Sequence, residues 1–260
     1  MSAGAAPAEA LIRFSNVALA FAGRRILEGI DLEIRRGEIV CLVGPSGCGK
    51  TTALRIATGL LAPTRGAIAF DGAPLLGPRR DVAIVFQDYG KALLPWRTAA
   101  GNVALALEAA GTPRHERPAR IAALLAKVGL PSHADKYPAE MSGGMQQRLQ
   151  IARCLAQEPA ALMMDEPFGA LDAMTRQELQ DEMLALVATT GATVLFVTHD
   201  LEEAIYVGDR VVGLAPHPGR IGIELEIALP RPRDQIATRE DPEFLRLRRE
   251  LHDFIKSAQR

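Results

Sequence analysis

Residues 39–52 read IVCLVGPSGCGKTT, and this stretch decides the fold. The first five residues are apolar and rich in β-branched side chains, which predicts a buried strand, and apolar residues at helical spacing over 53–60 predict a helix. Between them, glycines let the backbone N–H groups turn toward phosphate oxygens, Lys50 adds positive charge, and the Thr51 hydroxyl suits Mg²⁺. This order of strand, glycine-rich loop and helix predicts a P-loop. The residues expected to hold a nucleotide are Gly44, Pro45, Ser46, Gly47, Cys48, Gly49, Lys50, Thr51 and Thr52.

The composition is that of an ordinary globular protein. The chain has 260 residues, of which 48% are hydrophobic and 23% charged, and this excludes collagen-like and disordered classes. Its formal net charge is −1, so it lacks the overall positive charge of a nucleic-acid-binding protein, and we expect no nucleic-acid partner. Three scattered cysteines predict neither a disulfide framework nor a cysteine zinc site, which favours a reducing compartment.

The N-terminus lacks the pattern of a signal peptide, and no stretch reaches the length of about 18 apolar residues that a spanning helix needs. We therefore expect a protein that, if it serves a membrane, does so from the cytoplasmic side.

Alternating strand and helix patterns predict an α/β fold with a mostly parallel sheet. Buried strands are expected at 81–86, 161–164, 193–197 and 210–214, whereas 11–17 and 30–34 alternate apolar and polar residues and predict an N-terminal antiparallel β subdomain. Strand signals vanish between 89 and 157, which indicates an inserted α-helical subdomain. The tail combines a short strand at 221–227 with a helix from Asp241 that carries the apolar stripe Phe244, Leu247, Leu251, Phe254 and Ile255.

Two adjacent carboxylates follow the predicted strand at 161–164. Because side chains alternate along a strand, we expect them to point in different directions and to act differently. Asp165 can hold a metal ion through its water shell, and Glu166 can accept a proton from a water molecule that attacks the γ-phosphate. Together with the P-loop, this pair predicts hydrolysis of ATP or GTP.

The stretch MSGGMQQR at 141–148 opens a predicted helix. Ser142 is a good N-cap, and the two glycines leave the helix N-terminus open to a second anion. One chain thus carries two anion-binding helix ends but one P-loop. Two copies arranged head to tail would pair each P-loop with the Ser-Gly-Gly of the other copy, which predicts a homodimer.

With these motifs in place, the sequence resembles the ATP-binding subunits of ABC transporters over nearly its whole length. GPSGCGKTT resembles Walker A, VFQDYG the Q-loop, MSGGMQQR the signature, ALMMDEP Walker B, GALD the D-loop and VTHD the switch histidine. The signature departs from the usual LSGGQ at Met141 and Met145.

The resemblance implies a P-loop NTPase core at 1–88 and 158–230, a helical subdomain at 89–157 and a C-terminal helical tail at 231–260, all in one ABC ATPase domain. It implies that ATP and Mg²⁺ lie at the homodimer interface. The implied catalytic residues are Glu166 and His199, the implied further ATP contacts are Phe21 and Gln87, the implied contacts from the second copy are Ser142, Gly143, Gly144 and Asp172, and the implied metal ligands are Thr51, Gln87 and Asp165. A core position is the alternative for Phe21.

Two further segments narrow the subfamily. LLPW at 93–96, and HPGRI at 217–221 with LPRPR at 229–233, resemble the ATPases of nitrate, sulfonate and taurine importers. This likeness implies permease subunits as partners, an extracytoplasmic solute-binding protein as an indirect partner, and a peripheral position on the cytoplasmic face of the membrane. Trp96 either packs its own loop or docks the permease. An exporter or lipid-trafficking ATPase, and an ABC ATPase that transports nothing, remain as alternatives.

Overall fold

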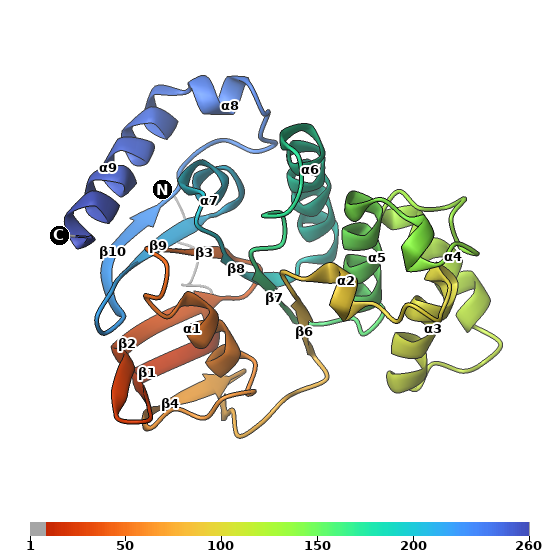
Figure 1. Ribbon diagram of the computed structural model, residues 1–260, viewed down its shortest axis with the longest axis horizontal. Helices are drawn as coiled ribbons and strands as arrows, with labels where there is room; N and C mark the ends of the chain where they lie inside the picture. The colour runs from red at the N-terminus through yellow and green to blue at the C-terminus, as the bar shows by residue number, and fades with distance from the viewer. Residues whose placement is uncertain (1–8, 260) are drawn as a thin grey trace, which may run out of the picture. The chain divides into compact units, whose positions relative to one another are not determined.

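The computed structural model describes residues 9–259 (Figure 1). The chain forms two compact units. The first unit comprises Met1–Arg79 and Gly191–Arg260, and the second comprises Arg80–Thr190. The chain therefore leaves the first unit once and returns to it.

An antiparallel sheet in the first unit follows the alternation of apolar and polar residues. β1 (Ala10–Phe21) pairs with β2 (Arg24–Arg35) and with β4 (Arg65–Phe70), and β4 pairs with the short β5 (Ala73–Pro74). Ile12 and Phe14 of β1 are buried, as alternation requires, and a register shift after Phe14 lets Val17 be buried as well. The two predicted antiparallel strands are confirmed and are longer than expected. The sequence did not single out β4, in which small residues weaken the alternation.

The remaining strands of the first unit carry the P-loop. β3 (Ile39–Val43) runs parallel to β8 (Thr193–Val197) and to β9 (Arg210–Ala215), and β10 (Arg220–Glu226) is antiparallel to β9. Every residue of β3 and β8 is buried, which is why these strands read as continuous apolar runs. The helices of this unit are α1 (Lys50–Ala57), α7 (Leu201–Val207), α8 (Ala237–Glu240) and α9 (Pro242–Ala258).

The C-terminal helix packs on the β9–β10 hairpin (Figure 1). Asp241 caps α9 by accepting a hydrogen bond from the N–H of Glu243 at 2.7 Å, and Phe244, Leu247 and Leu251 are fully buried, as predicted. A Cβ atom at Gly213 would lie 2.6 Å from Cε1 of Phe254, and one at Gly222 would lie 2.5 Å from its Cε2. The glycines therefore let the Phe254 ring approach the hairpin.

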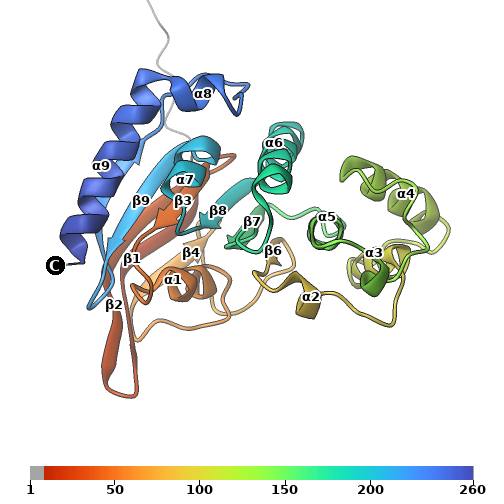
Figure 2. The same ribbon diagram turned by 45° about the horizontal axis from the view of Figure 1, so that its top comes forward.

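The second unit combines two parallel strands with a helical insertion. β6 (Val82–Val85) pairs with β7 (Ala161–Asp165). The helices of this unit are α2 (Tyr89–Ala92), α3 (Ala99–Ala109), α4 (Arg117–Lys127), the 3₁₀ turn Pro138–Glu140, α5 (Gly143–Leu155) and α6 (Ala173–Thr190). The segment between the two strands contains α3, α4 and α5, which pack against one another (Figure 2). The predicted α/β fold and its helical insertion are confirmed. Among residues 9–259, none of the helices combines the length and apolar character that crossing a membrane requires.

Candidate functional site

The glycine-rich loop after β3 is curled by glycines that other residue types cannot readily replace. Gly44, Gly47 and Gly49 have φ values of 154°, 79° and 101°. A Cβ atom at Gly44 would lie 2.6 Å from the carbonyl oxygen of Leu214 and 2.7 Å from Sγ of Cys48. This close approach, and not φ alone, makes glycine necessary at that position.

Lys50 is the first residue of α1 and is buried. Its Nζ donates to the carbonyl oxygens of Gly44 at 2.7 Å and Pro45 at 3.1 Å. Carbonyl groups satisfy the hydrogen-bonding needs of the ammonium without neutralising its charge, so the loop attracts an anion at the point where α1 also presents its positive end.

The other P-loop side chains differ in their exposure. Ser46 is exposed and Thr51 and Thr52 are half-buried, whereas Cys48 is buried, and burial raises the pKa of its thiol against the opposing charge of Lys50. The protonated thiol fits a spacer and not a nucleophile.

His199 lies at the same sheet edge as the P-loop. It follows β8, whose parallel neighbour β3 is followed directly by Gly44, and the N–H of Thr198 donates to the carbonyl oxygen of Leu42 at 3.2 Å. The His199 side chain is exposed. Open α/β sheets bind ligands at this carboxyl edge, so the fold brings these two predicted features to the place where a ligand can meet both.

Phe21 ends β1, and 76% of its surface is exposed. This exposure excludes the alternative of a core aromatic residue. A bare aromatic ring in the unit that holds the P-loop is available for stacking.

In the second unit, Gln87 and Glu166 meet. Gln87 follows β6, Asp165 is the last residue of the neighbouring strand β7, and Nε2 of Gln87 donates to Oε2 of Glu166 at 3.2 Å. Our argument from strand alternation was wrong for Glu166, which lies beyond the strand with a φ of 44°. The left-handed backbone, rather than the pleat of a strand, directs its side chain. Such conformations concentrate at functional sites.

The signature motif and the D-loop also lie together in this unit. Oγ of Ser142 accepts a hydrogen bond from the N–H of Met145 at 3.3 Å and so caps α5, as predicted. A Cβ atom at Gly144 would lie 2.7 Å from Cγ2 of Thr175. Thr175 in turn donates its N–H to Oδ1 of Asp172 at 3.1 Å, and hydrogen bonds from Thr175 hold the pKa of Asp172 below its usual value.

Gly143 begins α5, and Met141 before it is buried. Gln146, one residue after the departure at Met145, donates to the carbonyl oxygens of Pro138 at 2.9 Å and Met141 at 3.1 Å. Although Met145 departs from the usual motif, the next residue, Gln146, joins the signature helix to the preceding turn by these two hydrogen bonds.

Sequence reasoning missed Thr175 and the bond between Gln87 and Glu166. The signal for the bond was present, because Gln87 directly follows one predicted strand and Glu166 lies two residues after another, but reading it requires knowing that these two strands are neighbours. Across residues 9–259, no three His, Cys, Asp or Glu side chains are grouped so that they alone could hold a metal ion. A Mg²⁺ ion that is bound largely through phosphate oxygens needs no such group.

The chain is similar to known proteins of one family. Residues 27–169 match the model of the ABC transporter family. The chain is 47% identical to the aliphatic sulfonates import ATP-binding protein of Burkholderia lata, covering 92% of this chain and 84% of that protein. It is 45% identical to the nitrate import ATP-binding protein of Synechococcus elongatus, covering 90% of this chain but 36% of that longer protein.

A solved structure of an ATP-binding cassette, a dimer in a post-hydrolysis state bound to ADP and Pi, is similar with a TM-score of 0.70 and 31% identity, covering 83% of this chain and 98% of that one. The family match and these identities lead to one conclusion. The chain belongs to the ABC transporter family, as an ATP-hydrolysing subunit of the importer kind.

Proposed function

We propose that two copies of this chain bind two Mg·ATP between them and that hydrolysis drives the permease of an importer for a small solute such as nitrate, a sulfonate, taurine or a related small organic anion. The named functions of the nitrate and sulfonate relatives support the solute class, and the dimeric, ADP-bound relative supports the assembly. The proposed nucleotide-binding core comprises residues 1–88 and 158–230, with the helical subdomain at 89–157 and the tail at 231–260.

The observation that carries the proposal is that one chain holds two separate anion-binding features. The first is the loop around the buried Lys50, and the second is the Ser142-capped end of α5, which begins with the half-buried Gly143 and the buried Gly144. A single nucleotide sandwiched between copies uses one feature from each. In this arrangement Ser142, Gly143, Gly144 and Asp172 act on the nucleotide of the partner copy.

The proposed chemistry assigns each side chain a task. Thr51, Gln87 and Asp165 offer hydroxyl, amide and carboxylate oxygens, the hard ligands that Mg²⁺ prefers, and the bound ion neutralises phosphate charge. Lys50 binds the β- and γ-phosphates, and Phe21 stacks on adenine. Glu166 takes a proton from the attacking water, while His199 orients the γ-phosphate and this water.

The permease is proposed to dock beside Trp96. This side chain is 71% exposed, so the alternative of loop packing has no support from burial. Its loop is nevertheless held firmly, because the buried Asn102 donates to the carbonyl oxygens of Leu94, Arg97 and Thr98 and accepts from the N–H of Leu94. A rigid loop with an exposed aromatic anchor is typical of a binding hot spot. Docking to a permease places the chain on the cytoplasmic face of the membrane, with a solute-binding protein as an indirect partner.

Dimerisation is tested with Glu166→Gln, which keeps the shape of the side chain but removes its basicity. Purified variant with saturating Mg·ATP should sediment as a dimer, return to a monomer when ATP is removed, and hydrolyse ATP at least about 100-fold more slowly than the wild type. Glu178→Gln, at an exposed acid of the same unit, is the matched control and should behave as the wild type. A Glu166→Gln protein that stays monomeric, with and without its membrane partner, contradicts the proposal.

Transport is tested by recovering the tagged full chain from solubilised membranes of its own cells. An importer subunit should bring down a multi-spanning permease, and Trp96→Ala should reduce that recovery while leaving ATP hydrolysis by the isolated chain unchanged. Recovery of no permease favours the ABC ATPases that transport nothing. A permease that exports its solute from loaded vesicles favours the exporter alternative.

A further inference from the structure

The C-terminal arm, defined as residues 229–258, contacts both ends of α7. This helix is seven residues long and begins two residues after His199. So short a helix is not stable by itself, because the cost of nucleation exceeds what a few hydrogen bonds return. Its position must therefore come from the groups that surround it.

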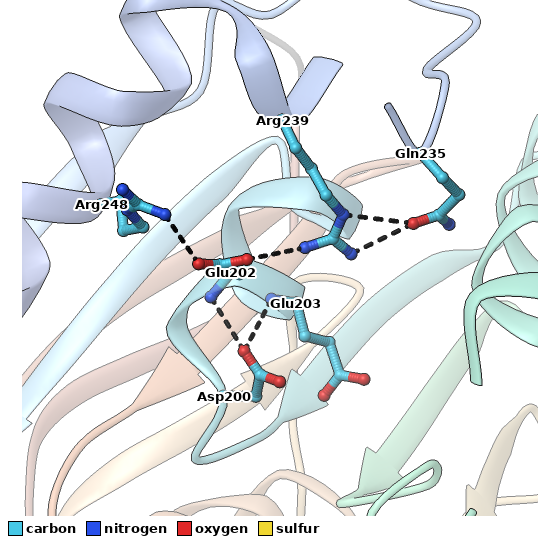
Figure 3. Close-up of polar contacts among 6 residues, drawn as sticks. All are labelled: Asp200, Glu202, Glu203, Gln235, Arg239 and Arg248. Atoms are coloured by element: carbon cyan, nitrogen blue, oxygen red, sulfur yellow. Dashed lines mark hydrogen bonds and ion pairs between the residues drawn. The ribbon is translucent and has the colours of Figure 1, made fainter. Parts of the chain in front are cut away.

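At the first turn of α7, both carboxylate oxygens of Glu202 are bound by arginines of the arm (Figure 3). Nη1 of Arg248, from α9, lies 2.9 Å from Oε1, and Nη1 of Arg239, from α8, lies 3.2 Å from Oε2. Arg239 is itself oriented by Gln235, whose Oε1 accepts hydrogen bonds from Nε at 3.2 Å and Nη2 at 3.1 Å. The guanidinium also stacks over the ring of Tyr206 in α7, 4.9 Å from its centroid.

At the last turn of α7, two further arginines of the arm bind the carbonyl oxygens that the helix leaves unpaired. Nη2 of Arg231 donates to Val207 at 3.3 Å, and Nη1 of Arg233 donates to Ile205 at 3.1 Å and also to Tyr206. Burial lowers the pKa of Arg233 to about 10, so it remains charged at neutral pH. Positive charge at this end of a helix is favourable.

The backbone of His199 connects α7 to the fixed sheet. Before it, the N–H of Thr198 is bonded to the carbonyl oxygen of Leu42 in β3. After it, Oδ1 of Asp200 accepts from the N–H groups of Glu202 and Glu203 at 3.0 and 3.1 Å and caps α7 (Figure 3). His199 thus lies between a fully buried strand and a helix that packs on the sheet and that the arm contacts at both ends.

We propose that Arg239 and Arg248, acting through Glu202, are positioning residues for His199. The C-terminal arm is then part of the hydrolytic machinery as well as a cover for the β9–β10 hairpin. This inference rests on the proposed role of His199 in hydrolysis. Because the proposal has these arginines act through Glu202 on the loop of His199 and not on the phosphate-binding loop, their loss should lower kcat and leave the KM for ATP unchanged.

The experiment is a double-mutant cycle between R239A/R248A and H199A in the full chain, with kcat and KM for ATP measured well below the unfolding temperature of every variant. R239A/R248A should lower kcat about fivefold in the wild-type background, since half-exposed ion pairs are weak, and should not lower it further in the H199A background. R246A is the matched control. This substitution also removes two ion pairs, those of Arg246 with Glu243 and Glu250 within α9, and it should leave kcat unchanged.

The outcomes separate the two hypotheses. If H199A hydrolyses ATP as fast as the wild type, the proposed role of His199 fails, and the inference fails with it. If H199A is slow but R239A/R248A lowers kcat equally in both backgrounds, or in neither, His199 keeps its role and the inference about the arm is overturned. Should R239A/R248A not fold, the same cycle with E202Q decides, because this change keeps the shape of the side chain and removes only its charge.

Discussion

Gln87 donates from Nε2 to Oε2 of Glu166 at 3.2 Å, from the end of one strand to the residue just beyond the next. A hydrogen bond donated to a carboxylate fixes the direction of its oxygens. A general base needs such a fixed direction, because it must face the water that it activates. The pair therefore gives Gln87 a positioning task beside its proposed place at the metal ion.

Gln87→Ala should lower kcat for ATP hydrolysis about tenfold, the factor that corresponds to losing one hydrogen bond to a charged group. Steady-state hydrolysis at saturating Mg·ATP is the measurement. Gln157→Ala, at a half-buried amide of the same unit outside the site, is the control and should retain the wild-type rate. A Gln87→Ala rate equal to that of the wild type would falsify the positioning task.

Lys50→Ala should weaken ATP binding about 10- to 100-fold, because charge-assisted hydrogen bonds to phosphate are lost. Calorimetric titration with ATP in the presence of Mg²⁺ measures the affinity. Lys136→Ala removes an exposed lysine outside the P-loop and should bind ATP as the wild type does. Unchanged affinity in the Lys50 variant is incompatible with the phosphate cradle.

The three thiols should be unreactive in the folded protein. Cys41, Cys48 and Cys154 are buried, and burial raises the pKa of each, to about 12 for Cys154. Because the thiolate is the reactive form, titration with a disulfide reagent at pH 8 should modify no cysteine rapidly in the native state and all 3 after unfolding. Rapid native modification of one thiol means that its surroundings open.

The same groups make stability depend on alkaline pH. A raised pKa in the folded state contributes stability that is fully present below the unfolded pKa of about 8.5 and is lost as pH rises toward the folded value. The free energy of unfolding should therefore fall as pH rises above about 8.5, as urea denaturation at a series of pH values would show. A variant with all three cysteines changed to alanine should lose this part of the slope, and an unchanged slope would assign it to other groups.

Gly213→Ala should destabilise the protein by about 1–3 kcal/mol, the usual cost of overpacking. The new methyl group would collide with the Phe254 ring of α9, 2.6 Å away, and with Cγ2 of Ile223, 2.5 Å away. Chemical denaturation measures the change. In a Phe254→Ala background the same substitution should cost less, since one of the two clashes is gone. Gly77→Ala, where a Cβ meets nothing within 4 Å, is the control, and a cost equal to that of Gly213→Ala would contradict the packing argument.

Local sequence patterns were sufficient to predict the elements whose residues are all buried or are buried at a strict period. The buried runs of β3 and β8, the glycine loop between β3 and α1, the Ser142 cap and the stripe of α9 were all predicted, because each is set by neighbours in the chain. The sequence did not single out β4 and α6, whose patterns are weaker.

The sequence by itself determined the chemistry of this protein, since the phosphate loop with its lysine is one short stretch, the paired carboxylates are another, and the residue types in each indicate its chemistry. Only the tertiary structure decided which residues act on one another. The bond from Gln87 to Glu166 and the grip of Arg239 and Arg248 on Glu202 join residues 79, 37 and 46 positions apart. Such pairs depend on which strands and helices become neighbours, and that is settled by packing the whole core rather than by any short stretch of sequence.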